Sequence, residues 1–213
     1  MDIAGVRQLA ATGIDTSNMD VYEFGVYSGN SLATIMAHFN IFAISPRKVF
    51  GFDSFEGLPF DGDPANDPGW AKGAINSQNL FKTTDVNEIK RAICGIIGFD
   101  NTVLIEGFYE DSLKDDIVAT HDMHPACYLN IDCDLYASTI CALEFMLRNK
   151  LIVKNTIIRY DDWGGTMVLA PEFEAGESKA HKEMMEKYGV KCRQIYKVGY
   201  PPHIETIFVV EEI

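Results

Sequence analysis

The sequence predicts an α/β protein with a mostly parallel, seven-stranded sheet and helices on both of its faces. Strand-like and helical segments alternate along most of the chain, which is typical of parallel strands joined by helical crossovers. The last two strand-like segments follow each other without a helix, so we expect one antiparallel strand near the C-terminus. The chain has 213 residues, a length that suits a single domain over 1–213.

The first half of the chain is predicted from the spacing of its apolar residues. Leu32, Ile35 and Phe39, for example, form one stripe when their segment is drawn as a helix. The predicted elements are a helix over 2–12, a strand over 20–25, a helix over 31–42 and a strand over 48–53.

Residues 54–79 form a long segment without helical or strand periodicity, rich in Gly, Pro and Asp. A loop of this length in a compact domain is usually functional or mobile. We interpret it as a candidate lid or substrate loop. Trp70 in this loop either packs on a bound substrate or anchors the loop itself.

The second half of the chain continues the alternation. Thr84 or Asp85 is expected to cap one helix, Asp111 or Ser112 another, and Gly189 to close the last one. The predicted helices cover 84–98, 111–120, 138–150 and 176–189, and the predicted strands cover 102–107, 126–134, 155–162, 192–198 and 205–212.

Charge and composition exclude several classes of protein. Lys and Arg number 18 against 31 Asp and Glu, a net charge of −13, and no basic cluster is present. Nucleic acid and membrane are therefore not expected as partners. The chain lacks an apolar run of about 18 residues and a secretory leader pattern, so we expect a cytoplasmic protein. Five cysteines without a C-x-x-C pair argue against a disulfide framework or a structural zinc site.

Every predicted parallel strand ends in a carboxylate. In an open α/β sheet, ligands bind beyond the carboxyl ends of the strands, so these side chains should meet at one edge. This concentration of acids is the strongest signal for a functional site in the residues themselves. The acids are Glu23, Asp53, Glu106, Asp132, Asp134, Asp161 and Asp162.

The stretch "YEFGVYSGNS" contains an E-x-G-x-x-x-G motif between a strand and a helix. Gly25 and Gly29 would let the backbone approach a ligand closely, and Glu23 suits a ligand with an ammonium or hydroxyl group, such as S-adenosylmethionine. A plain strand-to-helix turn explains the motif equally well. Asp53 can accept the hydroxyls of a ribose or serve as a helix cap, and Phe108 lies where adenine would stack or belongs to the core.

Asp132 and the pair Asp161–Asp162 should meet at neighbouring strand ends. Three close carboxylates repel one another unless a cation compensates them, and an all-oxygen ligand set suits Mg²⁺ or Mn²⁺. The alternative is that Asp134 and Asp162 cap the following segments. That explains only one acid of each pair.

These motifs resemble those of a known family. The stretches "YEFGVYSGNSL", "GFDSFEGLP", "IEGFYEDSL", "LNIDCDLYAST" and "DDWGG" occur in this order. From about residue 20 to the C-terminus the chain resembles the macrocin O-methyltransferase family, which comprises sugar O-methyltransferases that depend on Mg²⁺ and S-adenosylmethionine. Only about 20 residues precede the glycine motif, fewer than in many relatives, which leaves the acceptor pocket and any homo-oligomer contacts open.

The resemblance implies a Rossmann-like class I methyltransferase fold and assigns roles to individual residues. It implies Asp132, Asp161 and Asp162 as metal ligands and Asp134 as the general base. If Asp134 is not the base, the histidines His121, His124 and His203 are the candidates to test. The cofactor-binding residues that it implies are Glu23, Gly25, Tyr27, Ser28, Ser31, Asp53, Ser54, Glu106, Gly107, Phe108 and Asp132.

The expected function is methyl transfer from S-adenosylmethionine to a hydroxyl of a sugar or another polyhydroxylated small molecule, in natural-product or glycan biosynthesis. Two alternatives stay open at this point. A D-x-D motif after an apolar strand also occurs in metal-dependent glycosyltransferases. A methyltransferase-like domain can also bind the cofactor without turnover.

Overall fold

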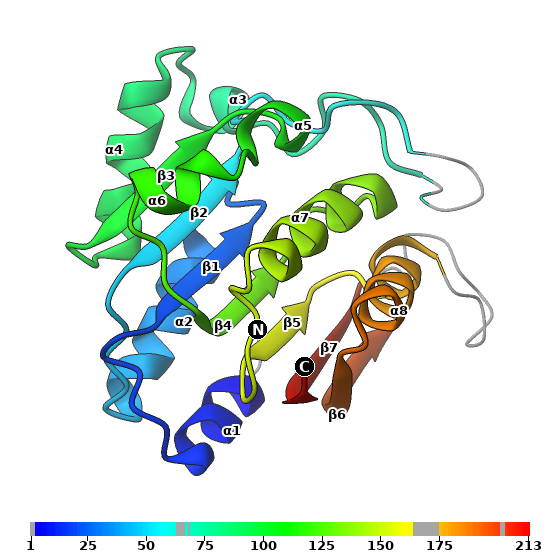
Figure 1. Cartoon of the computed structure of the whole chain (residues 1–213). Helices are drawn as coiled ribbons and strands as arrows, with labels where there is room; N and C mark the ends of the chain where they lie inside the picture. Colours follow the sequence, from blue (N-terminus) through cyan, green and yellow to red (C-terminus); the bar gives the residue numbers. More distant parts are fainter. Residues whose placement is uncertain (1–2, 63–66, 68, 164–174, 201–202) are drawn as a thin grey trace.

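The computed structural model describes residues 3–62, 67, 69–163, 175–200 and 203–213. Seven strands form one sheet in the order β3-β2-β1-β4-β5-β7-β6 (Figure 1). β7 pairs antiparallel with β5 and with β6, and the other neighbours pair in parallel, as predicted. The strands are β1 (Asp20–Phe24), β2 (Val49–Asp53), β3 (Thr102–Glu106), β4 (Ala126–Ile131), β5 (Ile157–Tyr160), β6 (Lys191–Tyr200) and β7 (His203–Glu212).

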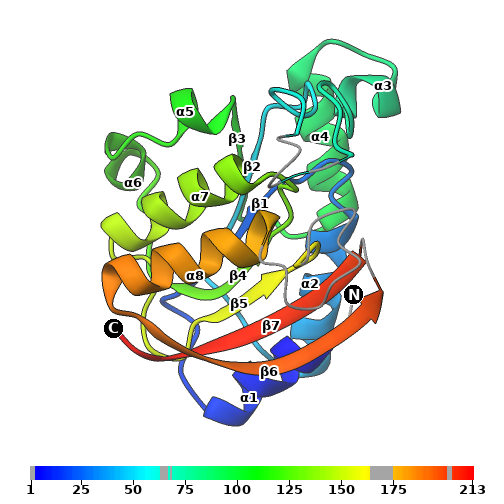
Figure 2. The ribbon, with the colours of Figure 1, turned by 90° about the vertical axis from the view of Figure 1, so that its right-hand side faces the viewer.

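Helices cover both faces of the sheet, because each face carries its own apolar cluster. One cluster packs α1 (Ala4–Thr12), α2 (Asn30–Ile41) and α4 (Val86–Ile97) against the strands. The other includes residues from α5 (Tyr109–Ser112), α6 (Asp116–Thr120), α7 (Tyr136–Arg148) and α8 (Gly176–Tyr188). Figure 2 shows the sheet between these two groups. Within the described residues, no helix is long and apolar enough to cross a membrane.

Local sequence signals explain several helix ends. Asp85 caps α4 by accepting a hydrogen bond from the backbone N–H of Asn87 at 2.9 Å, and Gly189 closes α8 in the left-handed conformation, as predicted. The single helix expected over 111–120 is wrong. The chain forms α5 and α6 instead, because Leu113 leaves helical geometry and packs into the core.

β2 ends at Asp53, as predicted, but two other parallel strands end earlier than predicted. β4 ends at Ile131 and β5 at Tyr160, so the acids after them lie in turns at the carboxyl edge. The sheet order reverses between β1 and β4, and the space beyond these strands is where open α/β sheets bind ligands. The candidate lid runs into a short helix, α3 (Ser77–Phe81), which continues two residues beyond it.

Candidate active site

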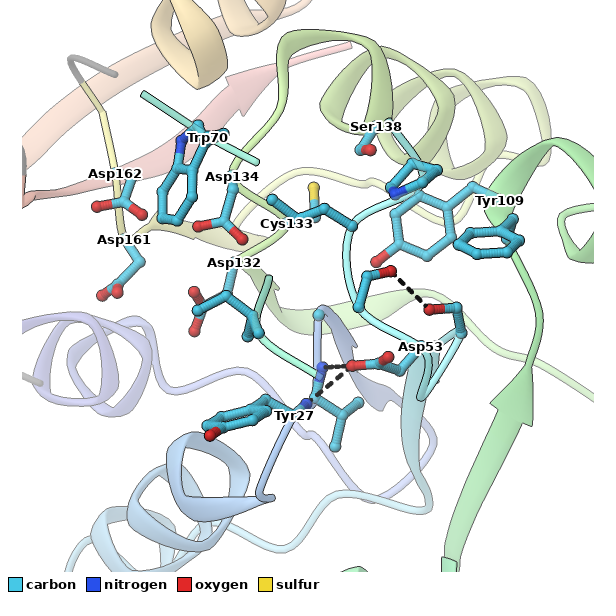
Figure 3. A pocket seen from close by; sticks show the side chains of 18 of the residues that line it. Tyr27, Asp53, Trp70, Tyr109, Asp132, Cys133, Asp134, Ser138, Asp161 and Asp162 are labelled. Atoms are coloured by element: carbon cyan, nitrogen blue, oxygen red, sulfur yellow. Dashed lines mark hydrogen bonds between the residues drawn. The ribbon is translucent and has the colours of Figure 1, made fainter. Parts of the chain in front are cut away.

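A cavity of about 330 Å³ opens at this edge of the sheet (Figure 3). The turn after β1, the ends of β2 and β3, the turns after β4 and β5, and the lid all contribute to its wall. It contains nine of the predicted cofactor-binding residues, all three predicted metal ligands and the predicted base. These are Gly25, Tyr27, Ser28, Ser31, Asp53, Ser54, Gly107, Phe108, Asp132, Asp134, Asp161 and Asp162.

Glu23 and Glu106, also predicted to bind the cofactor, are not among the residues that line the cavity. Glu106 lies about half exposed and forms an ion pair with Lys90, 3.1 Å between Oε2 and Nζ. Glu23 is completely buried. Glu23 lies one residue before the end of β1 and Glu106 is the last residue of β3, and their carboxylates contact Asn130 and Lys90. A role of either residue in cofactor binding stays a prediction.

The glycine motif has a structural explanation. Gly25 adopts a φ of +90°, and a Cβ atom there would lie 1.8 Å from the backbone oxygen of Asp132. A Cβ atom on Gly29, at φ +81°, would lie 2.9 Å from a methyl group of Ile93. Both glycines are therefore required by close approach to the chain itself, to the backbone after β4 and to α4. The predicted close approach to a ligand stays a prediction.

Asp53 organises the turn after β1. One carboxylate oxygen accepts hydrogen bonds from the backbone N–H groups of Val26 and Tyr27, both at 2.8 Å, and the other from that of Phe55 at 2.6 Å. Burial raises its pKa above the usual value, while these three hydrogen bonds act to lower it. A ribose hydroxyl would therefore have to share Asp53 with the backbone of the turn.

A row of buried polar side chains crosses the sheet beneath the cavity. Glu23, Asn130 and Arg159 are register partners on β1, β4 and β5. Asn130 donates to Glu23 at 2.6 Å and accepts from Arg159 at 2.7 Å. Arg159 also donates to Asp161 and, at 2.9 Å, to Glu205. The row joins the strand before the glycine turn to one of the predicted metal ligands.

Burial raises the pKa of Glu23 to about 8, from an unfolded value near 4.5. Between these values the folded chain holds a proton that the unfolded chain has released, so stability falls as the pH rises. In Glu23→Gln this contribution is absent. We therefore compare the unfolding free energies of the wild type and the variant. Between the two pKa values, the wild type should lose up to about 1.4 kcal/mol relative to the variant for each unit by which the pH rises. Urea unfolding at pH 5, 6, 7 and 8 measures it, and a difference independent of pH would contradict the assignment.

The four acids after β4 and β5 lie together on one side of the cavity (Figure 3). Burial, followed by repulsion from neighbouring acids, raises the pKa of Asp132 and Asp134 well above its ordinary value. The sequence predicted that the strand would continue to Asp134, but β4 ends at Ile131. Asp134 has a φ of +65°, a conformation that Asp tolerates better than most residues, and this turn directs it into the cavity.

Two of the four acids, Asp161 and Asp162, contact side-chain donors of the protein. Asp161 accepts a hydrogen bond from Arg159, and Asp162 Oδ1 lies 3.0 Å from Nδ1 of His203. Over 3–62, 67, 69–163, 175–200 and 203–213, no three or more His, Cys, Asp or Glu side chains are arranged to hold a metal ion. The predicted ligands are brought together, and the metal itself stays a prediction.

Two contacts around the site were not predicted, and one of the three candidate histidines lies in the site. Glu177 of α8 is fully buried and accepts the backbone N–H of Asp162 at 3.0 Å. Asp67 of the lid accepts the backbone N–H of Tyr136 at 2.7 Å, at the start of α7, which lacks a cap from its own N-cap residue. His203 lines the cavity, whereas His121 and His124 precede β4 and lie at the other end of that strand.

The comparison with known families identifies the family of this chain. The family model described as macrocin O-methyltransferase (TylF) matches residues 5–193. The chain belongs to the macrocin O-methyltransferase family. Membership favours methyl transfer over the glycosyltransferase alternative. No curated protein sequence matches the chain.

Solved structures with the same fold include two methyltransferases. CalS11, described as calicheamicin methyltransferase, has a TM-score of 0.67 at 21% identity. The match covers 95% of this chain and 75% of the CalS11 chain. The O-methyltransferase NovP has a TM-score of 0.66 at 18% identity, with 99% and 78% covered. Fibrillarin of Aeropyrum pernix, solved with S-adenosylmethionine bound, has a TM-score of 0.51 at 11% identity, with 97% and 76% covered. The fold is that of class I methyltransferases.

Proposed function

We propose that this chain transfers a methyl group from S-adenosylmethionine to a hydroxyl of a sugar or another polyhydroxylated small molecule, with the help of Mg²⁺. One observation carries the proposal. A single cavity joins the turn after β1, which class I methyltransferases use for the cofactor, to four carboxylates on two adjacent strand ends. Family membership supplies the reaction class.

The cofactor side of the cavity suits a ligand without phosphate. Ser28, Ser31 and Ser54 offer hydroxyl groups, and Gly107 and Phe108 form the wall beyond β3. S-adenosylmethionine, when bound, supplies an electrophilic methyl group on a positively charged sulfur. The neighbouring acids make the cavity attractive to that charge, and the chain holds the two reactants close together.

The acid side of the cavity suits a divalent cation by its donor type, because carboxylate oxygens are the ligands that Mg²⁺ prefers. Asp132, Asp161 and Asp162 are the residues that would hold it. Mg²⁺, when bound, supplies positive charge that makes an acceptor hydroxyl more acidic. Asp134 lines the same side and would take the hydroxyl proton on its carboxylate.

The proposal predicts a mass gain of about 14 daltons on a polyhydroxylated acceptor incubated with S-adenosylmethionine and Mg²⁺, the mass of a methyl group replacing a hydrogen. Activation of the hydroxyl by the metal and by the base should each contribute at least about 100-fold to the rate of methyl transfer. EDTA should therefore lower the rate by at least that factor, and added Mg²⁺ should restore it. Mass spectrometry across glycosylated acceptors, with and without EDTA, measures both. Full activity in EDTA would remove the metal from the proposal and leave methyl transfer standing.

A further inference from the structure

The start of α3 contacts the turn that follows β1, although the two segments are far apart in the sequence. Ser77, the first residue of α3, is completely buried, and its hydroxyl donates a hydrogen bond to the backbone oxygen of Tyr27 at 2.9 Å. The next residue, Gln78, donates its backbone N–H to the backbone oxygen of Phe55 at 3.2 Å. The first two residues of α3 therefore hold one residue in the turn after β1 and one in the turn after β2.

Tyr27 and Phe55 share an unusual backbone conformation. Their φ angles are +46° and +60°, in the left-handed region that large side chains rarely adopt. Such a conformation costs free energy and persists only where the surrounding structure holds it. Asp53 accepts the backbone N–H of Tyr27 at 2.8 Å (Figure 3) and that of Phe55 at 2.6 Å. Each of the two residues is therefore held on both sides, at its N–H by Asp53 and at its carbonyl oxygen by α3.

Only one of these two residues lies in the wall of the cavity. Tyr27 lines it, together with Val26 and Ser28 of the same turn, whereas Phe55 and Ser77 are not among the lining residues. A cofactor bound at this turn would meet the backbone that Asp53 and α3 hold in place. Ser77 itself would not touch the cofactor, so any effect of Ser77 on binding must pass through the conformation of Tyr27.

Resting on the proposed function, we propose that Ser77 is a positioning residue for S-adenosylmethionine. By holding the backbone oxygen of Tyr27, it keeps the turn after β1 in the conformation that binds the cofactor. Without the hydroxyl of Ser77, the left-handed Tyr27 is held at its N–H alone, and the turn spends more time in relaxed conformations. A ligand that binds one conformation has an apparent Kd that rises as the population of that conformation falls.

Ser77→Ala removes the hydroxyl and adds no bulk at the start of α3. We expect the Kd of S-adenosylmethionine, measured by calorimetry without acceptor, to rise about 3- to 10-fold, the value of one hydrogen bond. Thr16→Val is the matched control, because the buried Thr16 donates to the backbone oxygen of Ser45 at 3.3 Å, before β1 and β2 and away from the cavity. Its Kd should equal that of the wild type. An unchanged Kd in Ser77→Ala, or an equal rise in both variants, would overturn the inference.

Tyr27→Asn separates positioning from a general loss of stability. Asn tolerates a positive φ better than Tyr does, so the turn of this variant should depend less on Ser77. Adding Ser77→Ala to Tyr27→Asn should raise the Kd by less than about 2-fold, against 3- to 10-fold in the wild type. Because the comparison is made within each background, a direct contact between the Tyr27 ring and the cofactor cancels. The same factor in both backgrounds would contradict a route through Tyr27.

The wild type offers a test that needs no variant. Coupling between two sites is reciprocal, so a cofactor bound at the turn should also steady α3. Hydrogen exchange of the amides in α3 should slow at least about 3-fold at saturating S-adenosylmethionine, whereas exchange in α6, a helix of the same length away from the cavity, should not change. Unchanged exchange in α3 of a protein that binds the cofactor would overturn the inference and leave the proposed function intact. No cofactor binding by the wild type would contradict the proposed function, and the inference would fall with it.

Discussion

Gly25→Ala should cost the chain about 4 kcal/mol or more in unfolding free energy, at the upper end of what single substitutions do. The added Cβ atom would lie 1.8 Å from the backbone oxygen and 2.7 Å from the backbone carbon of Asp132. Neither atom belongs to a flexible side chain, so the ends of β1 and β4 would have to separate. Gly25 donates its N–H to Phe52 and Asp132 donates to Phe24, both at 2.9 Å, and these backbone hydrogen bonds oppose that movement.

Gly13→Ala is the matched control for this variant. Gly13 also has a positive φ, +67°, but no atom lies within 4 Å of the position of an added Cβ. The unfolding free energy of the control should fall by only about 1–2 kcal/mol, the cost of placing alanine in the left-handed conformation. Urea unfolding followed by circular dichroism compares the two. Equal transition midpoints would mean that the strand ends separate readily, and the close approach at Gly25 would then lose its importance.

Local sequence was sufficient to predict the sheet and the edge at which the site forms. Strand character and helical stripes depend on neighbouring residues, and parallel strands bring their carboxyl ends together whatever the details of packing. That is why Asp132, Asp134, Asp161 and Asp162 could be placed in one site from the sequence. The same reasoning expected Glu23 at the cavity, which it does not line, because a position near a strand end gives no information on whether the side chain faces the cavity or is buried within the sheet. Its role in cofactor binding stays a prediction.

The remaining features depend on contacts between distant parts of the chain. The hydrogen bond from Tyr136 to Asp67 joins residues 69 positions apart, and no local pattern marks it. The polar row of Glu23, Asn130 and Arg159 did leave a signal. Each is a polar residue inside an apolar strand, at the position before the last residue of β1, β4 and β5. Polar residues at equivalent positions on adjacent strands must pair with one another when they are buried.

Asp134→Asn should lower the rate of methyl transfer by roughly 10²–10⁴-fold, the usual contribution of a positioned proton acceptor. Asn fills the same volume and tolerates the φ of +65° at this position, so the turn should persist. Asp134 is not among the residues proposed to hold the metal. Affinity for Mg²⁺ and for S-adenosylmethionine, measured by calorimetry, should therefore stay close to the wild-type values, and excess Mg²⁺ should not restore the rate.

His203→Gln separates the two candidate bases in the cavity. His203 lies 3.0 Å from Asp162 but is largely exposed, 73% for its side chain, whereas Asp134 is buried beside the other acids. A base must be held within hydrogen-bond reach of the acceptor hydroxyl, and a buried turn fixes its position better than an exposed side chain does. We expect His203→Gln to lose less than about 10-fold, well below the range of a general base. Near-normal turnover in Asp134→Asn, together with a loss above 100-fold in His203→Gln, would transfer the role of base to His203.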